Sequence, residues 1–288
     1  MRAARLLAVL LLSPAMAGRA EAQADRAPAR ALAHYDLEAG AAWRAELPRG
    51  LSEVSGLAFT PGGMLLAQED ERAIVWRYDI ARRQPVARFG LGDRTGVLHG
   101  DFEDLAVVGD RVFLVTAFGE IFEGRVLDDG QTGPAARRTP GLARTCEAEG
   151  LTWDPDTRSL LLLCKAVRSR RWQDRMVILA VSIDTWRFER EPRILVTDDE
   201  LERATGRSRF HGTGMARHPL TGTLLVVAGP ERTYVELSPA GKVLGGGRLD
   251  RKRHRQPEGI AVAPDLTLLI SDEAAGRTAT ITAYAYRP

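Results

Sequence analysis

A short motif recurs five times along the chain and constrains its fold more than any other feature of the sequence. Each copy starts with Ser, Thr or Glu, continues with Gly or Asp, and then runs into mostly apolar residues; the copies span residues 55–59, 103–107, 149–153, 213–217 and 258–262. Units repeated at such spacings are typical of solenoids and propellers, in which each unit buries its faces against its neighbours. The sequence therefore predicts one repeat domain.

Each motif is followed by a turn and then by a second apolar run. Pro61-Gly62-Gly63 and Pro264-Asp265 are examples of these turns, and turn residues between two short β-rich runs are typical of hairpins. Third and fourth runs follow, as at residues 74–78 and 86–91 in the first unit. Four antiparallel strands per unit, repeated around a ring, predict an all-β fold, a five-bladed β-propeller.

The spacing of the motifs sets the number of blades. The first residues of successive copies, at 55, 103, 149, 213 and 258, are 48, 46, 64 and 45 positions apart. The long interval exceeds one blade by too little for a further blade of about 40–50 residues, so we expect an insertion at 198–209 with a short helix starting at Asp198. The last blade has three visible strands, and residues 41–47 are expected to supply its outer strand and close the ring.

The first 24 residues have the order of a secretory signal peptide. Arg2 and Arg5 precede an apolar run at 6–12, and small residues follow up to the expected cleavage site Ala22-Gln23-Ala24,. An uncleaved N-terminal anchor is the alternative. We expect residues 25–40 to form a flexible lead-in, residues 41–288 to form the propeller, and the protein to be periplasmic or secreted, with no transmembrane segment after cleavage.

The net charge gives no reason to expect a nucleic-acid partner. The whole chain has 40 basic and 38 acidic residues, and removal of residues 1–24 leaves 37 of each. A neutral, exported chain does not favour nucleic acid or an anionic membrane as partner. We expect a monomer whose partner is a small anionic ligand or an envelope protein.

Cys146 and Cys164 are the cysteines of the chain, and both lie in the third unit. A hairpin turn at 154–158 would bring them near each other, so a local disulfide is compatible with an oxidising compartment. Two free, partly buried thiols are equally compatible. Neither arrangement forms a zinc site, which would need more ligands.

The first residue of each motif is a candidate for binding. The first strand of each propeller blade lines the central channel, so Ser55, Glu103, Glu149, Thr213 and Glu258 should converge at one end of it. Carboxylates held close together repel one another unless a cation neutralises them, and Ca²⁺ accepts oxygen ligands in flexible geometry, which suits a wide, water-filled axis. Hydrogen bonds from neighbouring backbone N–H groups to these side chains are the alternative.

The motifs resemble those of the SdiA-regulated, YjiK-like family of exported bacterial propellers. The resemblance rests on Ser-Gly-Leu-Ala, Phe-Glu-Asp-Leu-Ala, Glu-Gly-Leu-Thr and Pro-Glu-Gly-Ile-Ala, and on Leu-Leu-Ile-Ser-Asp-Glu at 268–273, and it covers roughly residues 43–287. Single motifs of this kind also occur in NHL-type repeats and in phytase-like esterases. The resemblance implies a five-bladed propeller that binds calcium through Glu103, Glu149 and Glu258, with no established biochemical activity.

Further candidates lie next to the motifs. His211 precedes the fourth motif by two residues, and a basic run with Arg251, Arg253 and Arg255 precedes the fifth. Arginines above a bound calcium ion would suit a phosphate or carboxylate ligand, although both features are also typical of solvated loops. The sequence thus predicts an exported calcium-binding module or scaffold, and the alternative is a calcium-dependent phosphoesterase, phytase-like, or a lactonase.

Overall fold

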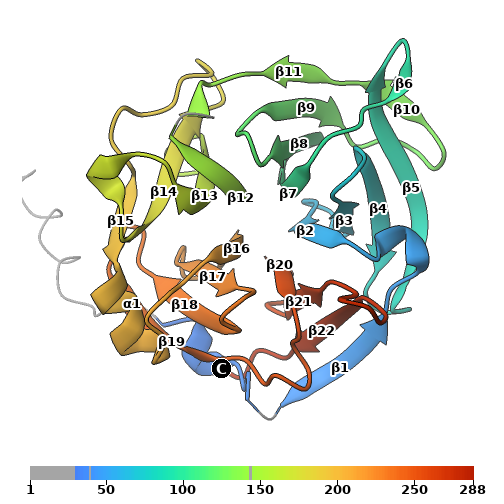
Figure 1. Ribbon diagram of the computed structural model, residues 1–288. Coiled ribbons are helices and arrows are strands. Elements are labelled where there is room, and N and C mark those ends of the chain that lie inside the picture. The colour runs from blue at the N-terminus through green and yellow to red at the C-terminus, as the bar shows by residue number, and fades with distance from the viewer. Residues whose placement is uncertain (1–29, 39, 143–144) are drawn as a thin grey trace, which may run out of the picture.

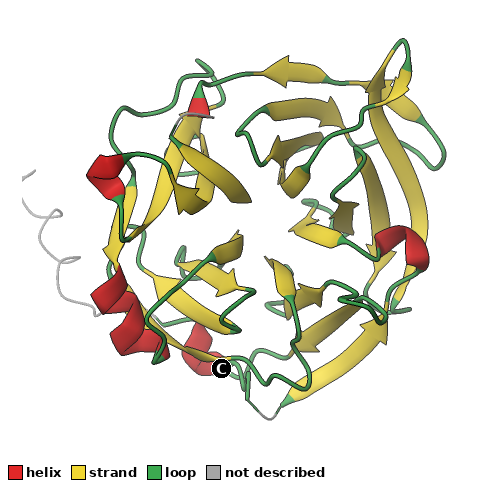
Figure 2. Ribbon diagram, viewed as in Figure 1, coloured by secondary structure: helices red, strands yellow, loops and turns green. Residues whose placement is uncertain are grey.

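A computed structural model describes residues 30–38, 40–142 and 145–288, and the signal peptide predicted at 1–24 lies outside this range. The described residues form five β-sheets arranged as blades around a central axis (Figure 1). Strands make up most of each blade, and helices lie at the rim of the ring (Figure 2). The predicted five-bladed β-propeller of four-stranded antiparallel blades is confirmed.

The blades follow one another along the chain, and each runs outward from the axis. Blade 1 contains β2 (Val54–Phe59), β3 (Leu65–Glu69), β4 (Ile74–Asp79) and β5 (Gln84–Asp93), with the short β6 (Gly96–Val97) beside β5; blade 2 contains β7 (Phe102–Val108), β8 (Arg111–Thr116), β9 (Ile121–Arg125) and β11 (Ala136–Arg138). Blade 3 contains β12 (Cys146–Asp154), β13 (Ser159–Val167), β14 (Arg175–Ser182) and β15 (Ile194–Thr197); blade 4 contains β16 (Gly212–Arg217), β17 (Leu224–Ala228), β18 (Thr233–Leu237) and β19 (Val243–Arg248). Blade 5 contains β20 (Pro257–Val262), β21 (Leu268–Asp272) and β22 (Thr280–Tyr284).

An N-terminal strand completes blade 5, as the sequence predicted. β1 (Ala41–Glu46) pairs antiparallel with β22, with Ala45 opposite Ile281 and Glu46 opposite Thr280. The blade therefore contains strands from both ends of the chain (Figure 1). This pairing removes the open edge that β22 would otherwise present.

The hydrophobic core is divided among the interfaces between neighbouring blades. One cluster, for example, packs Phe113 and Val115 of blade 2 against Leu160 and Leu162 of blade 3, and all four side chains are fully buried. Similar clusters lie between the other pairs of neighbouring blades. Each sheet is thus covered on both faces, which explains why second strands such as β13 and β17 have continuous apolar runs rather than alternating patterns,.

The Gly of the motif is required by the close approach of neighbouring inner strands. A Cβ atom on Gly214 would collide with the backbone carbonyl of Glu258, and one on Gly56 would lie 2.5 Å from Oδ1 of Asp104. Asp104 replaces Gly in the second copy, and its buried carboxylate accepts hydrogen bonds from the backbone N–H groups of Leu105 and Leu151, each at 2.7 Å. This side chain therefore joins blade 2 to blade 3.

The end of the predicted lead-in is packed rather than flexible. The 3₁₀ helix η1 (Leu32–His34) lies in this segment, and Ala31, Tyr35 and Leu37 are buried against blades 4 and 5. Glu236 of blade 4 accepts hydrogen bonds from the backbone N–H groups of residues 31 and 32. This packing could not be predicted, because the segment has no strong hydrophobic period.

The insertion in the long interval is a helix, as predicted. α1 (Asp198–Thr205) begins with a capping box between Thr197 and Glu200 and ends at Gly206, which adopts the left-handed conformation that favours glycine,. Leu201 attaches α1 to the ring through the core between blades 3 and 4. Two 3₁₀ helices complete the helical elements of the described residues, η2 (Arg49–Leu51) and η4 (Arg170–Trp172).

Two further features connect strands within and between blades. Cys146 and Cys164 form a disulfide between β12 and β13, with their Cα atoms 5.5 Å apart. This pairing decides between the two alternatives that the sequence left open. β10 (Thr132–Pro134), from the connection within blade 2, pairs in parallel with β5 and extends blade 1, which the sequence did not predict. Among the described residues, no helix has the length and apolar composition needed to span a bilayer.

Candidate functional site

Every inner strand contains a β-bulge at the first residue of its motif. In blade 2, Phe102 pairs with Thr116 and Asp104 with Val115, so that Glu103 has no partner in the ladder. The pairing skips the equivalent residue in three other blades in the same way, at Ser55, Glu149 and Thr213. In blade 5 the irregularity is wider, since the pairing skips both Glu258 and Gly259. A bulge re-aims the side chain that it carries. The repeated motif therefore encodes five re-aimed side chains at one end of the axis, which we call the channel mouth.

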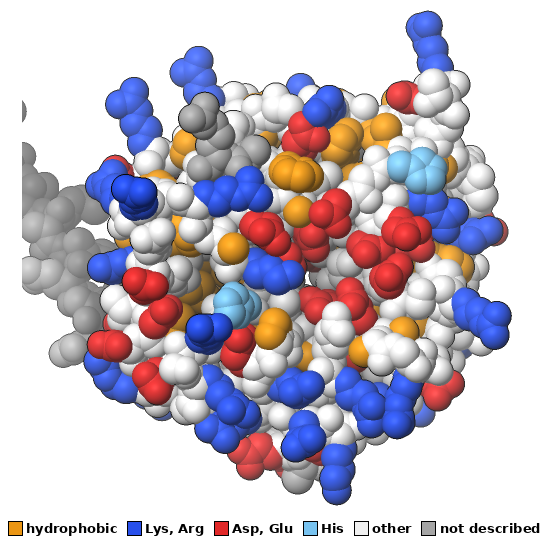
Figure 3. Space-filling view, in the orientation of Figure 1, with side chains coloured by type: hydrophobic (Ala, Val, Ile, Leu, Met, Phe, Trp, Pro, Cys, Tyr) orange, Lys and Arg blue, Asp and Glu red, His pale blue; other side chains and the backbone are white. Residues whose placement is uncertain are grey.

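The channel mouth is acidic. Figure 3 shows Asp and Glu side chains gathered around the centre of the ring, with a basic side chain among them. Glu149 is almost fully buried, whereas Glu103 and Glu258 are partly exposed. These are the three carboxylates that the sequence predicted to face one another.

Burial and neighbouring carboxylates raise the pKa values of these three carboxyl groups. Burial and then the charge of Glu149 raise the pKa of Glu103 to about 9. Burial and then the charge of Glu273 raise the pKa of Glu258 to about 8, and burial likewise raises the pKa of Glu149. A cation at the channel mouth would relieve this repulsion.

Lys165 supplies one positive charge at the channel mouth. Its Nζ donates a hydrogen bond to Oε1 of Glu149 at 2.7 Å. Burial lowers the pKa of Lys165, but the hydrogen bond and charge of Glu149 outweigh burial and leave it raised. Sequence reasoning missed this lysine. Its place directly after Cys164, at the end of a second strand, was an available signal, because second strands end at the side of the ring where first strands begin.

A second group of acids lies beside the first, at the ends of β3 and β21. Burial, and after it the charge of Asp70, raise the pKa of Glu273 to about 7. Burial and the charge of Glu53 raise the pKa of Asp70 to about 6, and its Oδ1 is buried without a hydrogen-bond partner in the described part of the chain. Gln256 donates a hydrogen bond to Glu273, which links this group to the fifth motif.

The two hydroxyl groups of the motif bond to backbone, and that of Thr213 joins blade 4 to blade 5. Thr213 Oγ1 donates to the carbonyl of Pro257 at 2.9 Å and accepts from the N–H of Gly229 at 3.2 Å. Ser55 Oγ donates to the carbonyl of Glu53 at 3.4 Å. The hydroxyl groups of Thr213 and Ser55 are thus both bonded to backbone.

Of His211 and the arginines of the basic run, some lie beside the channel mouth and others contact residues elsewhere. His211 Nδ1 lies 2.7 Å from Glu231 Oε1. Arg251 and Arg255 line a pocket beside the channel mouth. Arg253 instead contacts Asp250, the carbonyl of Glu38 and the hydroxyl of Tyr284, so it belongs to the packing of the lead-in.

Asp272, adjacent to Glu273, points away from the channel mouth. Its Oδ2 lies 2.8 Å from Nδ1 of His254, whose Nε2 lies 2.6 Å from the hydroxyl of Tyr284. All three side chains are buried. This network joins β21 and β22 to the loop before β20.

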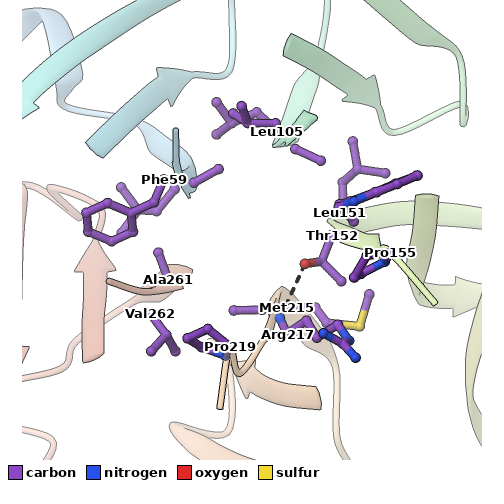
Figure 4. Close-up of a pocket in the computed structure, with 16 residues that line it drawn as sticks. Phe59, Leu105, Leu151, Thr152, Pro155, Met215, Arg217, Pro219, Ala261 and Val262 are labelled. Carbon is purple, nitrogen blue, oxygen red and sulfur yellow. Dashed lines mark hydrogen bonds between the residues drawn. The ribbon is translucent and has the colours of Figure 1, made fainter. Parts of the chain in front are cut away.

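A second part of the axis, beyond the channel mouth, forms a pocket of about 240 Å³ (Figure 4). Apolar residues such as Leu105, Leu151 and Ala261 line it, together with the polar Thr152 and Arg217. The backbone N–H of Arg217 donates a hydrogen bond to Oγ1 of Thr152 at 3.3 Å.

The donor types at the channel mouth suit a hard cation, whereas their present spacing does not form a closed cage. Carboxylate oxygens are the ligands that Ca²⁺ prefers. In the described ranges, however, no three His, Cys, Asp or Glu side chains are grouped closely enough to hold a metal ion. Lys165 binds Oε1 of Glu149, so a cation at that oxygen would have to displace it.

Comparisons with known proteins agree with the fold. No protein-family model matches the chain, and no curated protein matches it. Among solved structures, the glutaminyl cyclase of Myxococcus xanthus is 14% identical, with a TM-score of 0.56 over 86% of this chain and 97% of that one. A glucose dehydrogenase is 12% identical, with a TM-score of 0.53 over 83% and 98% of the two chains. At such identities the likeness concerns the β-propeller fold alone.

Proposed function

We propose that the protein is a binding propeller whose channel mouth takes up a cation, with Ca²⁺ as the first candidate. One observation carries this proposal: five bulges turn the motif side chains toward one end of the axis, and three of these are carboxylates with raised pKa values. An added positive charge would favour their ionised forms and release their protons. The sequence resemblance described above points to the same ion.

Glu103 and Glu258 would bind the ion directly or through water, and Glu149 would join them once Lys165 leaves it. The ion would supply a fixed positive charge at the channel mouth. The contribution of the chain is the rigid ring that keeps the carboxylates on one side of the axis, because each is anchored in a separate blade.

The proposal is tested by the effect of calcium on thermal unfolding. We expect Ca²⁺ to raise the melting temperature, because a ligand at about one hundred times its Kd stabilises the native state by roughly 2.7 kcal/mol. Glu103→Gln and Glu258→Gln should each reduce calcium affinity by at least about tenfold, the loss expected of a charged ligand group.

Glu202→Gln is the matched control, because Glu202 is exposed on α1, away from the channel mouth. It should leave calcium affinity unchanged. Absence of a calcium-dependent shift in the wild-type protein, measured against EDTA, would overturn the cation site.

A second function is favoured by the arginines that line a pocket beside the channel mouth. Arg251 and Arg255 there could hold a phosphate or carboxylate group,, as in a calcium-dependent phosphoesterase or a lactonase. Turnover of phosphomonoesters or lactones that is abolished by chelator would establish this function. Calcium stabilisation without turnover would favour a binding module.

We propose a periplasmic or secreted location for this module. The signal-peptide order of residues 1–24 and the disulfide between Cys146 and Cys164 support it, since disulfides persist in oxidising compartments. Cell fractionation of the full-length chain tests the location, and retention in the cytoplasm would contradict it.

A further inference from the structure

A pocket of about 600 Å³ beside the channel mouth is lined almost entirely by cationic side chains. Four of its lining residues are basic, and Gln256 and Ala275 complete it; the basic ones are Arg232, Arg251, Lys252 and Arg255. The described residues that line this pocket include no Asp or Glu. We call it the basic pocket.

Two acids close to the basic pocket along the chain, Asp250 and Glu231, are engaged elsewhere. Asp250 lies 3.8 Å from Arg253 and accepts a hydrogen bond from the backbone N–H of Lys252. Glu231 binds both the backbone N–H and the ring of His211. Within the described ranges, none of the four basic side chains has a carboxylate within 4.0 Å.

One arginine of the basic pocket is held in place by the backbone of the opposite loop. Arg232 Nε donates to the carbonyl of Arg255 at 2.9 Å, which leaves its two terminal nitrogens without a partner in the described part of the chain. A guanidinium fixed through Nε presents those nitrogens as a preformed donor pair. Such a pair binds phosphate or carboxylate oxygens in a bidentate manner.

The basic pocket adjoins the channel mouth directly. A second cavity of about 320 Å³ shares Arg232, Arg255 and Gln256 with it and is also lined by Lys165 and Glu258. A small molecule could therefore contact the arginines and the acidic channel mouth together. The two charge types occupy separate residues, so anion binding at the arginines does not require a cation at the glutamates.

We propose that the basic pocket is an anion subsite that binds a compact oxyanion, a phosphate or carboxylate group of a small ligand, independently of calcium. Arg232, Arg251, Lys252 and Arg255 supply the charge and the donors. Arg253 plays no part in it, because it is turned toward Asp250 and the lead-in. This assignment goes beyond the cation site and does not depend on it.

The test is a calorimetric titration of the full chain with inorganic phosphate in the presence of EDTA, followed by the same titration with acetate. We expect saturable binding that weakens by at least about tenfold in the double variant Arg251→Gln/Arg255→Gln, because charge-assisted hydrogen bonds are lost. Preference for phosphate would identify a phosphate-bearing ligand, and preference for acetate a carboxylate.

The matched control is Arg187→Gln/Arg190→Gln, which removes the same charge from exposed positions on blade 3 and should change binding less than about twofold. Equal weakening in the control would reduce the effect to net charge and overturn the subsite, as would the absence of saturable binding by either anion. Because chelator is present throughout, failure of the calcium site leaves this result unaffected. Thermal melting of both double variants confirms that they fold.

Discussion

Glu103, Glu258 and Glu273 combine into a pH-dependent term in stability. Burial is the largest cause that raises their folded-state pKa values, which are about 9, 8 and 7 respectively. All three lie above the ordinary value of 4.5. Between pH 4.5 and about pH 9, these three carboxyl groups bind protons in the native state that they have already released in the unfolded state. In the absence of metal, the stability that these groups contribute is therefore present at pH 4.5 and is lost as pH rises to about 9.

We accordingly predict that the free energy of unfolding in EDTA falls from pH 5.5 to pH 9. Chemical denaturation at these two values measures it. The double variant Glu103→Gln/Glu258→Gln should show a shallower fall, because two of the titrating groups are gone. A free energy that rises over this range, or an equally steep fall in the variant, would contradict the prediction.

The motif sufficed to predict some site residues and not others. Glu103, Glu149 and Glu258 could be predicted because each occupies the same position in a repeated unit. The repeated pattern did not mark Lys165, because no other blade repeats a cation at the end of its second strand. The separation of Arg253 from Arg251 and Arg255 depends on loop geometry, which a run of like charges does not encode.

At the scale of the strand, the bulge and the glycine of the motif act together. The bulge turns one side chain toward the channel mouth, and the following glycine lets the next inner strand approach. Substitution of Gly214 by Ala would drive a Cβ atom into the backbone carbonyl of Glu258. Because backbone cannot move aside as a flexible side chain can, we expect a loss of about 3 kcal/mol or more in unfolding free energy.

Gly245→Ala is the control for this prediction. Gly245 lies in the outer strand β19, and a Cβ atom there meets no heavy atom within 4 Å. Urea denaturation of the two variants should separate them clearly. Similar free energies for both would show that the inner strands do not need the glycine.

The elements that the sequence predicted are those marked by local patterns. The inner hairpins have apolar runs and turn residues, and α1 has its capping box, so both could be placed in advance. β10 and the packed lead-in have no such local pattern. β10 pairs in parallel with a strand about 40 residues earlier. The lead-in is held by Tyr35 and Leu37, which pack against blades that lie far along the chain. Tertiary contacts alone specify such elements.

At the scale of the whole molecule, the ring depends on its N-terminal segment. A chain of residues 48–288 lacks β1 and the buried side chains of Tyr35, Leu37 and Leu47. Burial of three such side chains contributes roughly 5 kcal/mol. We therefore predict a melting temperature at least about 10 °C below that of residues 30–288.

A chain of residues 41–288 separates the two contributions. It keeps β1 but loses η1 and the packed lead-in, so it should melt between the other two. Differential scanning fluorimetry of the three chains makes the comparison. Indistinguishable melting temperatures for the longest and the shortest would show that the ring does not need closure.

The pairing of β1 with β22 also sets the order of events during synthesis. The first strand of the ring to leave the ribosome is the outer strand of the last blade, and its partner follows only after the other four blades have been made. Until then β1 has an unpaired edge, and blade 5 is incomplete. The propeller thus reaches its closed form only once every blade has been synthesised, so its edges are exposed to other chains for longest at the junction of its two ends.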